Sequence, residues 1–175
     1  NEYIYADKEL GGLGLISVRD EYSIQSILQA FRNIICTDLI TRNLSRLNLS
    51  NTVAKYYETD NDWSLFDCLT WLNEGDRENG YRSWWTKVRN SIRYLDGIGL
   101  RIRFESNELG ICLKIHTDTE SIIIGEHQIK SASHEIHKMY SKLKFNKWSR
   151  QKVAGLSATA ISESSISSSI LYNNE

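Results

Sequence analysis

Two groups of basic side chains have the residue types and the spacing to bind a polyanion. In the first, Arg82, Arg89 and Arg93 follow one another at intervals of seven and four residues, which places them on one face of a helix, with Lys87 to the side. The second group surrounds Trp148 and comprises Lys138, Lys142, Lys144, Lys147, Arg150 and Lys152. Such cations can bind phosphates, and an aromatic ring can stack on a base. Each residue alone is more typical of a solvated surface or a core, but together they predict a nucleic-acid-binding surface.

Two histidines have the spacing of a metal site. His134 and His137 are three residues apart in a segment with helical periodicity, and Cys112 or His116 could complete a ligand set. Two histidines on a basic helix are more often solvated than metal-bound. We therefore expect no metal in this chain.

A metal-dependent nuclease is an alternative that the sequence leaves open. Glu105 or Glu108 could supply carboxylates beside Lys114, on segments with the alternation of strands. Their spacing is loose, and no set of serine, cysteine and histidine residues is typical of a nucleophilic triad. The sequence therefore predicts no catalytic residue, with the nuclease kept as an alternative.

Three glycines within four positions, Gly11, Gly12 and Gly14, raise the question of a phosphate-binding loop. Position 17 is a serine where a dinucleotide fingerprint needs a glycine, and no Gly-Lys-Ser/Thr sequence follows. The glycines also precede a short apolar segment instead of following a buried strand. We expect them to form a structural turn.

The charge of the chain is asymmetric, although its formal net charge is −1. Residues 1–79 carry 7 basic and 13 acidic side chains, whereas residues 128–152 carry 7 basic and 1 acidic. A basic second half indicates a polyanionic partner, while the acidic first half leaves open a protein-interaction domain. The three cysteines are far apart, which favours free thiols in a reducing compartment, and no apolar stretch has the length of a membrane span.

The elements that must position these residues follow from hydrophobic periodicity and from the absence of proline, which favours uninterrupted helices. A helix capped by Asp20 or Ser23 is predicted from the apolar stripe Ile24, Ile27, Leu28, Phe31, Ile34 and Ile35. A second helix is predicted to run through Leu39, Ile40, Leu44 and Leu47. Residues 50–64 have the polarity of a loop, and a short helix is predicted after it from Leu65, Leu69 and Leu72. A longer helix from Tyr81 to Leu95 is predicted to turn inward Trp84, Trp85, Val88 and Ile92.

The hydrophobic period changes from 3.6 to 2 near residues 97–100. Strands are predicted at 100–105, 109–115 and 121–125, with a hairpin connection at 105–110, followed by a helix at 129–148. The tail from residue 156 holds 7 serines in 20 residues, a composition typical of a flexible segment. The chain is therefore predicted to be α+β: a mainly helical bundle, then a small antiparallel sheet with a packed C-terminal helix.

The segment ADKELGGLGLISVRDEYSIQSILQAFRNI, residues 6–34, resembles the start of the thumb in reverse transcriptases of non-LTR retrotransposons. In that family a GGLGL-type element joins the palm to a long thumb helix. The segments SWWTKVRNSIRYL (83–95) and IHKMYSKLKFNKWSRQKVAG (136–155) are similar to the linker after the thumb in members that carry a restriction-like endonuclease. The family's K…W…QG residues correspond to Lys142, Trp148, Gln151 and Gly155, with three residues separating the last two.

The resemblance implies a palm-to-thumb connection at 1–19, a helical thumb-like domain at 20–96, a linker with a small sheet and a basic helix at 97–152, and a Ser-rich fragment end at 153–175. The parent protein would be a nuclear RNA-directed DNA polymerase that uses Mg²⁺ and assembles its ribonucleoprotein in the cytoplasm. The paired aspartates of the polymerase site and the endonuclease with its Cys/His knuckle do not occur in this sequence. The fragment would then hold no cofactor; its partners would be an RNA template, a DNA primer or target and the rest of the parent polyprotein, with no membrane.

Overall fold

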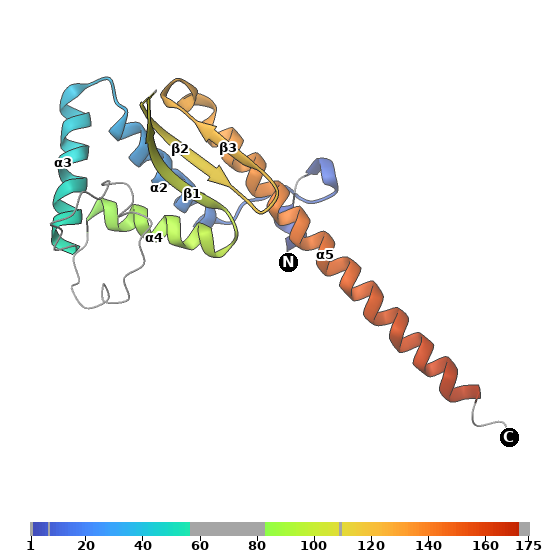
Figure 1. Cartoon of the computed structure of the whole chain (residues 1–175). Coiled ribbons are helices and arrows are strands. Elements are labelled where there is room, and N and C mark those ends of the chain that lie inside the picture. Colours follow the sequence, from blue (N-terminus) through green and yellow to red (C-terminus); the bar gives the residue numbers. More distant parts are fainter. Residues whose placement is uncertain (1, 7, 57–82, 109, 172–175) are drawn as a thin grey trace. The chain divides into compact units, whose positions relative to one another are not determined.

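The computed structural model describes residues 2–6, 8–56, 83–108 and 110–171, and its helices and three-stranded antiparallel sheet confirm the predicted α+β class (Figure 1). Two compact units make up the chain. The larger comprises Ile16–Tyr140, and the smaller comprises Asn1–Leu15 with Ser141–Glu175.

Helix α2 (Val18–Ile34) supplies the centre of the larger unit's core. Its predicted apolar stripe is buried from Ile24 to Ile34, whereas Ile35 follows the helix and is partly exposed. The predicted caps are wrong, because Ser17 caps the helix and accepts a hydrogen bond from the Asp20 backbone N–H at 3.1 Å. The Asp20 side chain is thereby left for a buried contact with other helices.

Helix α3 (Leu39–Tyr56) is present, but it ends later than the sequence predicts. The apolar residues on which it was predicted, Leu39, Ile40, Leu44 and Leu47, are all more than half exposed, whereas Leu49 and Val53 are buried. The neighbouring helix sets this orientation, because Trp85 donates a hydrogen bond through Nε1 to the Ser45 carbonyl at 3.1 Å. Residues 50–56 are helical where a loop was predicted, and the predicted helix at 65–72 lies outside the described residues.

The start of α3 is fixed by Asp38. Its carboxylate accepts hydrogen bonds from the Thr41 hydroxyl at 2.6 Å and the Thr41 backbone N–H at 2.9 Å. These bonds favour the ionised carboxylate and lower the pKa of Asp38 from its ordinary value of 3.8. The stability that this cap contributes is therefore present above the ordinary pKa and is lost as the pH falls through the lowered one.

Helix α4 (Trp84–Gly97) begins with a capping box between Ser83 and Thr86. Trp85, Val88 and Ile92 are buried as predicted, but Trp84 is 40% exposed and does not turn inward. The helix ends where the period change predicts, with Gly99 at φ +95° and the Leu100 N–H bonded to the Leu95 carbonyl at 2.9 Å. This turn leads directly into the first strand of the sheet, which begins at Arg101.

The sheet consists of β1 (Arg101–Asn107), β2 (Gly110–His116) and β3 (Ser121–Ile124), in that order. The pairing of Phe104 with Leu113 and of Leu113 with Ile124 places apolar side chains on one face. The Phe104 ring lies 6.3 Å from the rings of both Phe31 and Trp85, so this face covers α2 and α4. The strands extend further into the predicted hairpin connection, since Asn107 pairs with Gly110.

Helix α5 (Ile129–Leu171) follows the short helix η4 (Glu126–Gln128). Within the larger unit it buries Ala132, Ile136, Met139 and Tyr140, and His137 Nε2 lies 2.7 Å from a Glu21 carboxylate oxygen on α2. The predicted end near residue 148 and the flexible tail are wrong, because the backbone stays helical to Leu171. No proline interrupts it, and serine lowers helix propensity by only about 0.5 kcal/mol per residue. None of the helices in the described ranges is long and apolar enough to cross a membrane.

The three glycines form a turn in the smaller unit, after α1 (Glu2–Tyr5) and η1 (Lys8–Leu10). Gly11 and Gly14 have φ of +90° and +63°, a region that favours glycine. A Cβ on Gly12 would lie 2.3 Å from the carbonyl oxygen of Ala6. The turn is closed by the Gly14 N–H, which donates to the same Ala6 oxygen at 2.7 Å. Gly11, Gly12 and Gly14 therefore have a geometric role here.

Candidate nucleic-acid interface

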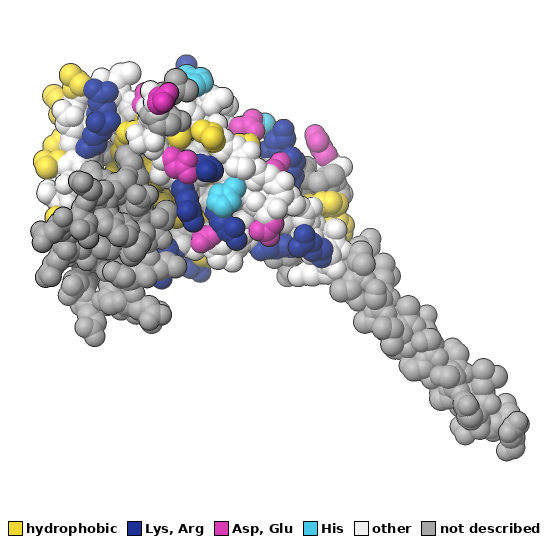
Figure 2. Space-filling view, viewed as in Figure 1, with side chains coloured by type: hydrophobic (Ala, Val, Ile, Leu, Met, Phe, Trp, Pro, Cys, Tyr) yellow, Lys and Arg dark blue, Asp and Glu magenta, His cyan; other side chains and the backbone are white. Residues whose placement is uncertain are grey.

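The outer face of the sheet carries basic side chains outside the two groups that the sequence predicts to bind a polyanion. On β1, Arg101 and Arg103 alternate with the buried Ile102, so both arginines lie on the face opposite the core. Arg103 pairs across the strands with Lys114, and Arg101 pairs with His116. Figure 2 shows dark blue, magenta and cyan side chains close together over the part of the larger unit where Figure 1 places the strands.

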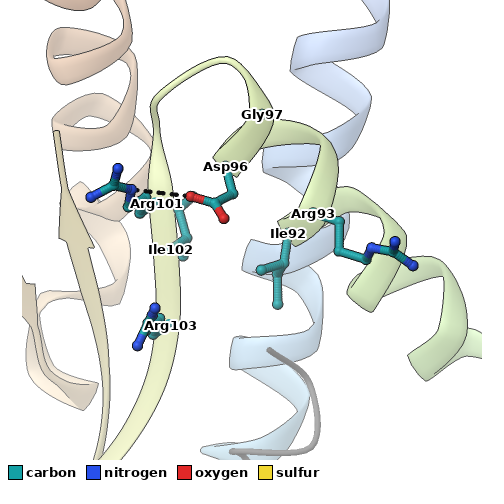
Figure 3. Close-up of a pocket in the computed structure, with 7 residues that line it drawn as sticks. All are labelled: Ile92, Arg93, Asp96, Gly97, Arg101, Ile102 and Arg103. Atoms are coloured by element: carbon teal, nitrogen blue, oxygen red, sulfur yellow. Dashed lines mark ion pairs between the residues drawn. The ribbon is translucent and has the colours of Figure 1, made fainter. Parts of the chain in front are cut away.

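A cavity of about 340 Å³ lies between the end of α4 and β1. Its lining residues are shown in Figure 3: Ile92, Arg93, Asp96, Gly97, Arg101, Ile102 and Arg103. Arg101 Nε lies 3.2 Å from an Asp96 carboxylate oxygen, which holds this guanidinium at the mouth of the cavity. Arg93 extends away from Asp96, with Ile92 between it and Arg101. Three guanidinium groups thus line the cavity: that of Arg101, which is paired with Asp96, and those of Arg93 and Arg103.

Arg93 and Arg103 make no ion pair with any residue in the described part of the chain, and both are exposed. Arg101, in contrast, is also 3.9 Å from Asp118, and Lys114 Nζ is 3.3 Å from Glu105. An arginine without a carboxylate partner keeps its full charge and its donors for a ligand. Arg93 and Arg103 are therefore the strongest candidates for phosphate contacts.

A second cavity, of about 520 Å³, shares Arg103 with the first. All of its lining residues have polar or charged side chains: Arg103, Glu105, Lys114, His116, Thr117, Thr119, Glu120 and Ser121. Here cations, carboxylates and hydroxyl groups alternate on one surface. The arrangement can accept hydrogen bonds from a ligand as well as donate them.

The α4 cations of the sequence analysis are only partly available to a ligand. Lys87 and Arg93 are exposed, but Arg89 is 8% exposed and belongs to the buried side of the helix. The expectation of an exposed arginine row is wrong at this position, because Arg89 lies four residues after Trp85 and three before Ile92, on the packed side of α4. Arg82 lies outside the described residues.

The basic residues of α5 have different environments. In the larger unit Lys138 is exposed. In the smaller unit Arg150 is exposed, Lys142 and Lys147 are partly exposed, and Lys144 is buried with its Nζ 5.6 Å from the centre of the Tyr5 ring. The side chain of Lys152 lies outside the described residues.

Trp148 was predicted to stack on a base, but its ring is used inside the smaller unit. It lies 5.5 Å from the Tyr3 ring and 5.7 Å from the Phe145 ring, both at tilted angles. Aromatic pairs at such distances stabilise packing. Trp148 is also partly exposed, so its role in stacking on a base stays a prediction.

Of the residues considered for a metal or a nuclease site, Glu105 and Lys114 lie together, but no group of metal ligands forms among the described residues. Among the described residues, no three His, Cys, Asp or Glu side chains are grouped so that they could hold a metal ion. Glu21 contacts His137, and Glu105 contacts Lys114. Cys112 is 3% exposed, and burial, together with the nearby Glu105 carboxylate, raises the pKa of its thiol despite the opposing effect of Lys114.

Comparison of this chain with protein-family models, with curated proteins and with solved structures gives no match. The geometry of the outer sheet face therefore carries the functional argument.

Proposed function

We propose that this chain is a non-catalytic nucleic-acid-binding fragment from the thumb and linker of a non-LTR retrotransposon reverse transcriptase. It would grip the duplex of RNA template and DNA primer and guide RNA or target DNA, while Mg²⁺ and the catalytic carboxylates belong to the parent polymerase. The resemblance of residues 6–34 and 136–155 supports the family. The nuclear location of the chain follows from the same proposal.

One observation carries the proposal: Arg93 and Arg103 line the same cavity, are exposed and make no ion pair with a described residue. A phosphodiester backbone supplies the negative charge that these guanidinium groups lack within the protein. Lys87 and Lys138, both exposed, would add further contacts. Because such contacts go to phosphates, binding should be tolerant of base sequence.

The proposal is tested by measuring the affinity of the whole chain for an RNA–DNA hybrid at one low salt concentration. The variant R93A/R103A should bind about tenfold or more weakly, since it loses two charge-assisted contacts. Its stability should change by less than about 0.5 kcal/mol, because both side chains are exposed. The loss should be equal for hybrids of unrelated sequence.

The matched control is R32A/R46A, which removes the same charge from exposed positions on α2 and α3. It should retain most of the wild-type affinity, because its effect is limited to long-range screening. Equal losses in the two double variants would contradict an interface at the sheet. Failure of the wild-type chain to bind any hybrid would exclude the function.

A further inference from the structure

The larger cavity on the outer sheet face has a composition that phosphate binding does not explain. Two cations, Arg103 and Lys114, line it beside two carboxylates, Glu105 and Glu120, and several hydroxyl groups. A carboxylate repels a phosphate at short range. A surface that contacts only a phosphate backbone would bind it more tightly without these acids.

The ion pair between Glu105 and Lys114 contributes too little to the stability of the fold to explain why a carboxylate lines this cavity. Lys114 Nζ and Glu105 Oε1 are 3.3 Å apart, but the two side chains are 41% and 40% exposed. Pairs with that exposure contribute little to stability because water and salt screen them. The pair does orient the carboxylate, which keeps one oxygen for Lys114 and the other for a further donor.

The remaining lining groups are held in place by the turn between β2 and β3. The Thr117 N–H donates to the Glu120 carbonyl at 2.9 Å, and the Thr117 hydroxyl oxygen accepts from the Glu120 N–H at 3.3 Å. Ser121 pairs with His116 at the start of β3. The cavity is open to the surface and has the Thr117 hydroxyl held next to its cations, with the hydroxyl groups of Thr119 and Ser121 exposed beside it.

We propose that this cavity recognises the ribose of an RNA strand, with Glu105 accepting a hydrogen bond from the 2′-hydroxyl while Arg103 and Lys114 contact the adjacent phosphates. The 2′-hydroxyl is the group that distinguishes RNA from DNA, and it can donate to a carboxylate. Arg103 also lines the neighbouring cavity, so the strand continues from the ribose site towards Arg93 and Arg101. This inference rests on the proposed function and assigns the RNA strand of the hybrid to one end of the sheet.

The test compares hybrids that share their sequence and differ only in the RNA strand, which is unmodified or 2′-O-methylated. Methylation removes the hydroxyl donor while keeping a ribose-type strand. The wild-type chain should bind the unmodified hybrid about tenfold more tightly, the effect of one hydrogen bond to a charged acceptor. In E105A this ratio should fall to about one, because the acceptor of the 2′-hydroxyl hydrogen bond is removed while Arg103 and Lys114 remain.

The matched control is E108A, which removes the same charge from an exposed position at the β1–β2 turn outside the cavity lining. E108A should keep the wild-type ratio. An unchanged ratio in E105A would overturn the assignment of the ribose to this cavity. Tight, salt-sensitive binding of both hybrids by the wild type with a ratio of one would overturn this inference and leave the proposed function intact, whereas no binding of either hybrid would overturn both.

Discussion

At the scale of single residues, the Asp20 carboxylate joins three helices of the larger unit. It is 2% exposed and accepts hydrogen bonds from the Tyr94 hydroxyl on α4 at 2.5 Å and from the Tyr140 hydroxyl on α5. The Arg19 guanidinium lies 4.1 Å from the centre of the Tyr94 ring. A buried carboxylate is costly unless it is hydrogen-bonded, so the two tyrosines are required partners.

Tyr140→Phe is expected to lower the free energy of unfolding by about 1 to 3 kcal/mol, because it removes one hydrogen bond from a buried carboxylate. Urea denaturation of the whole chain measures the loss. Tyr22→Phe is the control, since Tyr22 is 55% exposed and should change stability by less than about 0.5 kcal/mol. Equal effects of the two substitutions would argue against the Asp20 network.

The turn of the smaller unit gives a second prediction at this scale. Gly12→Ala should destabilise that unit by about 1 kcal/mol or more, because the new Cβ would overlap the Ala6 backbone. Gly14→Val should do the same through its φ of +63°. Gly97→Ala is the control: nothing lies within 4 Å of its Cβ position, and a helical alanine should be neutral or stabilising. Thermal unfolding at the wild-type temperature in both turn variants would remove the geometric explanation.

At the scale of elements, the sequence predicted which segments are helices and strands better than which faces they bury. The change of period near residues 97–100 located the end of α4 and the start of β1, because both are encoded locally. The buried face of α3 could not be read in this way. Its apolar residues lie on two sides, and contact with Trp85 and Ser83 on the neighbouring segment decides that Leu49 and Thr52 face inward.

Two leucines on α3 test this orientation. Leu49→Ala should cost about 2 to 5 kcal/mol of stability, since Leu49 is 1% exposed and its removal leaves a cavity. Leu47→Ala should cost less than about 0.5 kcal/mol, since Leu47 is 56% exposed. Chemical denaturation of both variants gives the comparison. A larger loss for Leu47 would contradict this orientation of α3.

At the scale of the whole molecule, the excess of basic residues after residue 80 was visible in the sequence, but its distribution over the surface was not. Arg89 does not belong to an exposed row of arginines, because it lies on the packed side of α4. The Trp148 ring contacts other aromatic rings. The alternation along β1 places Arg101 and Arg103 on one face, but it does not say which face covers the core. The structure buries the other face, so both arginines lie on the outer face of the sheet. The local sequence pattern thus predicted the helices and strands, whereas locating the candidate site required the structure, which shows how these elements pack.

The measurement that tests the central claim most directly is the salt dependence of hybrid binding by the wild type and R93A/R103A. Each phosphate contact releases counterions and contributes roughly 0.7 to 0.9 to the slope of log affinity against log salt. The wild type should therefore show a steep decrease, and the double variant a slope shallower by roughly 1.4 to 1.8 units. Identical slopes for the two proteins would contradict phosphate binding by Arg93 and Arg103, and salt-independent binding would contradict the account as a whole.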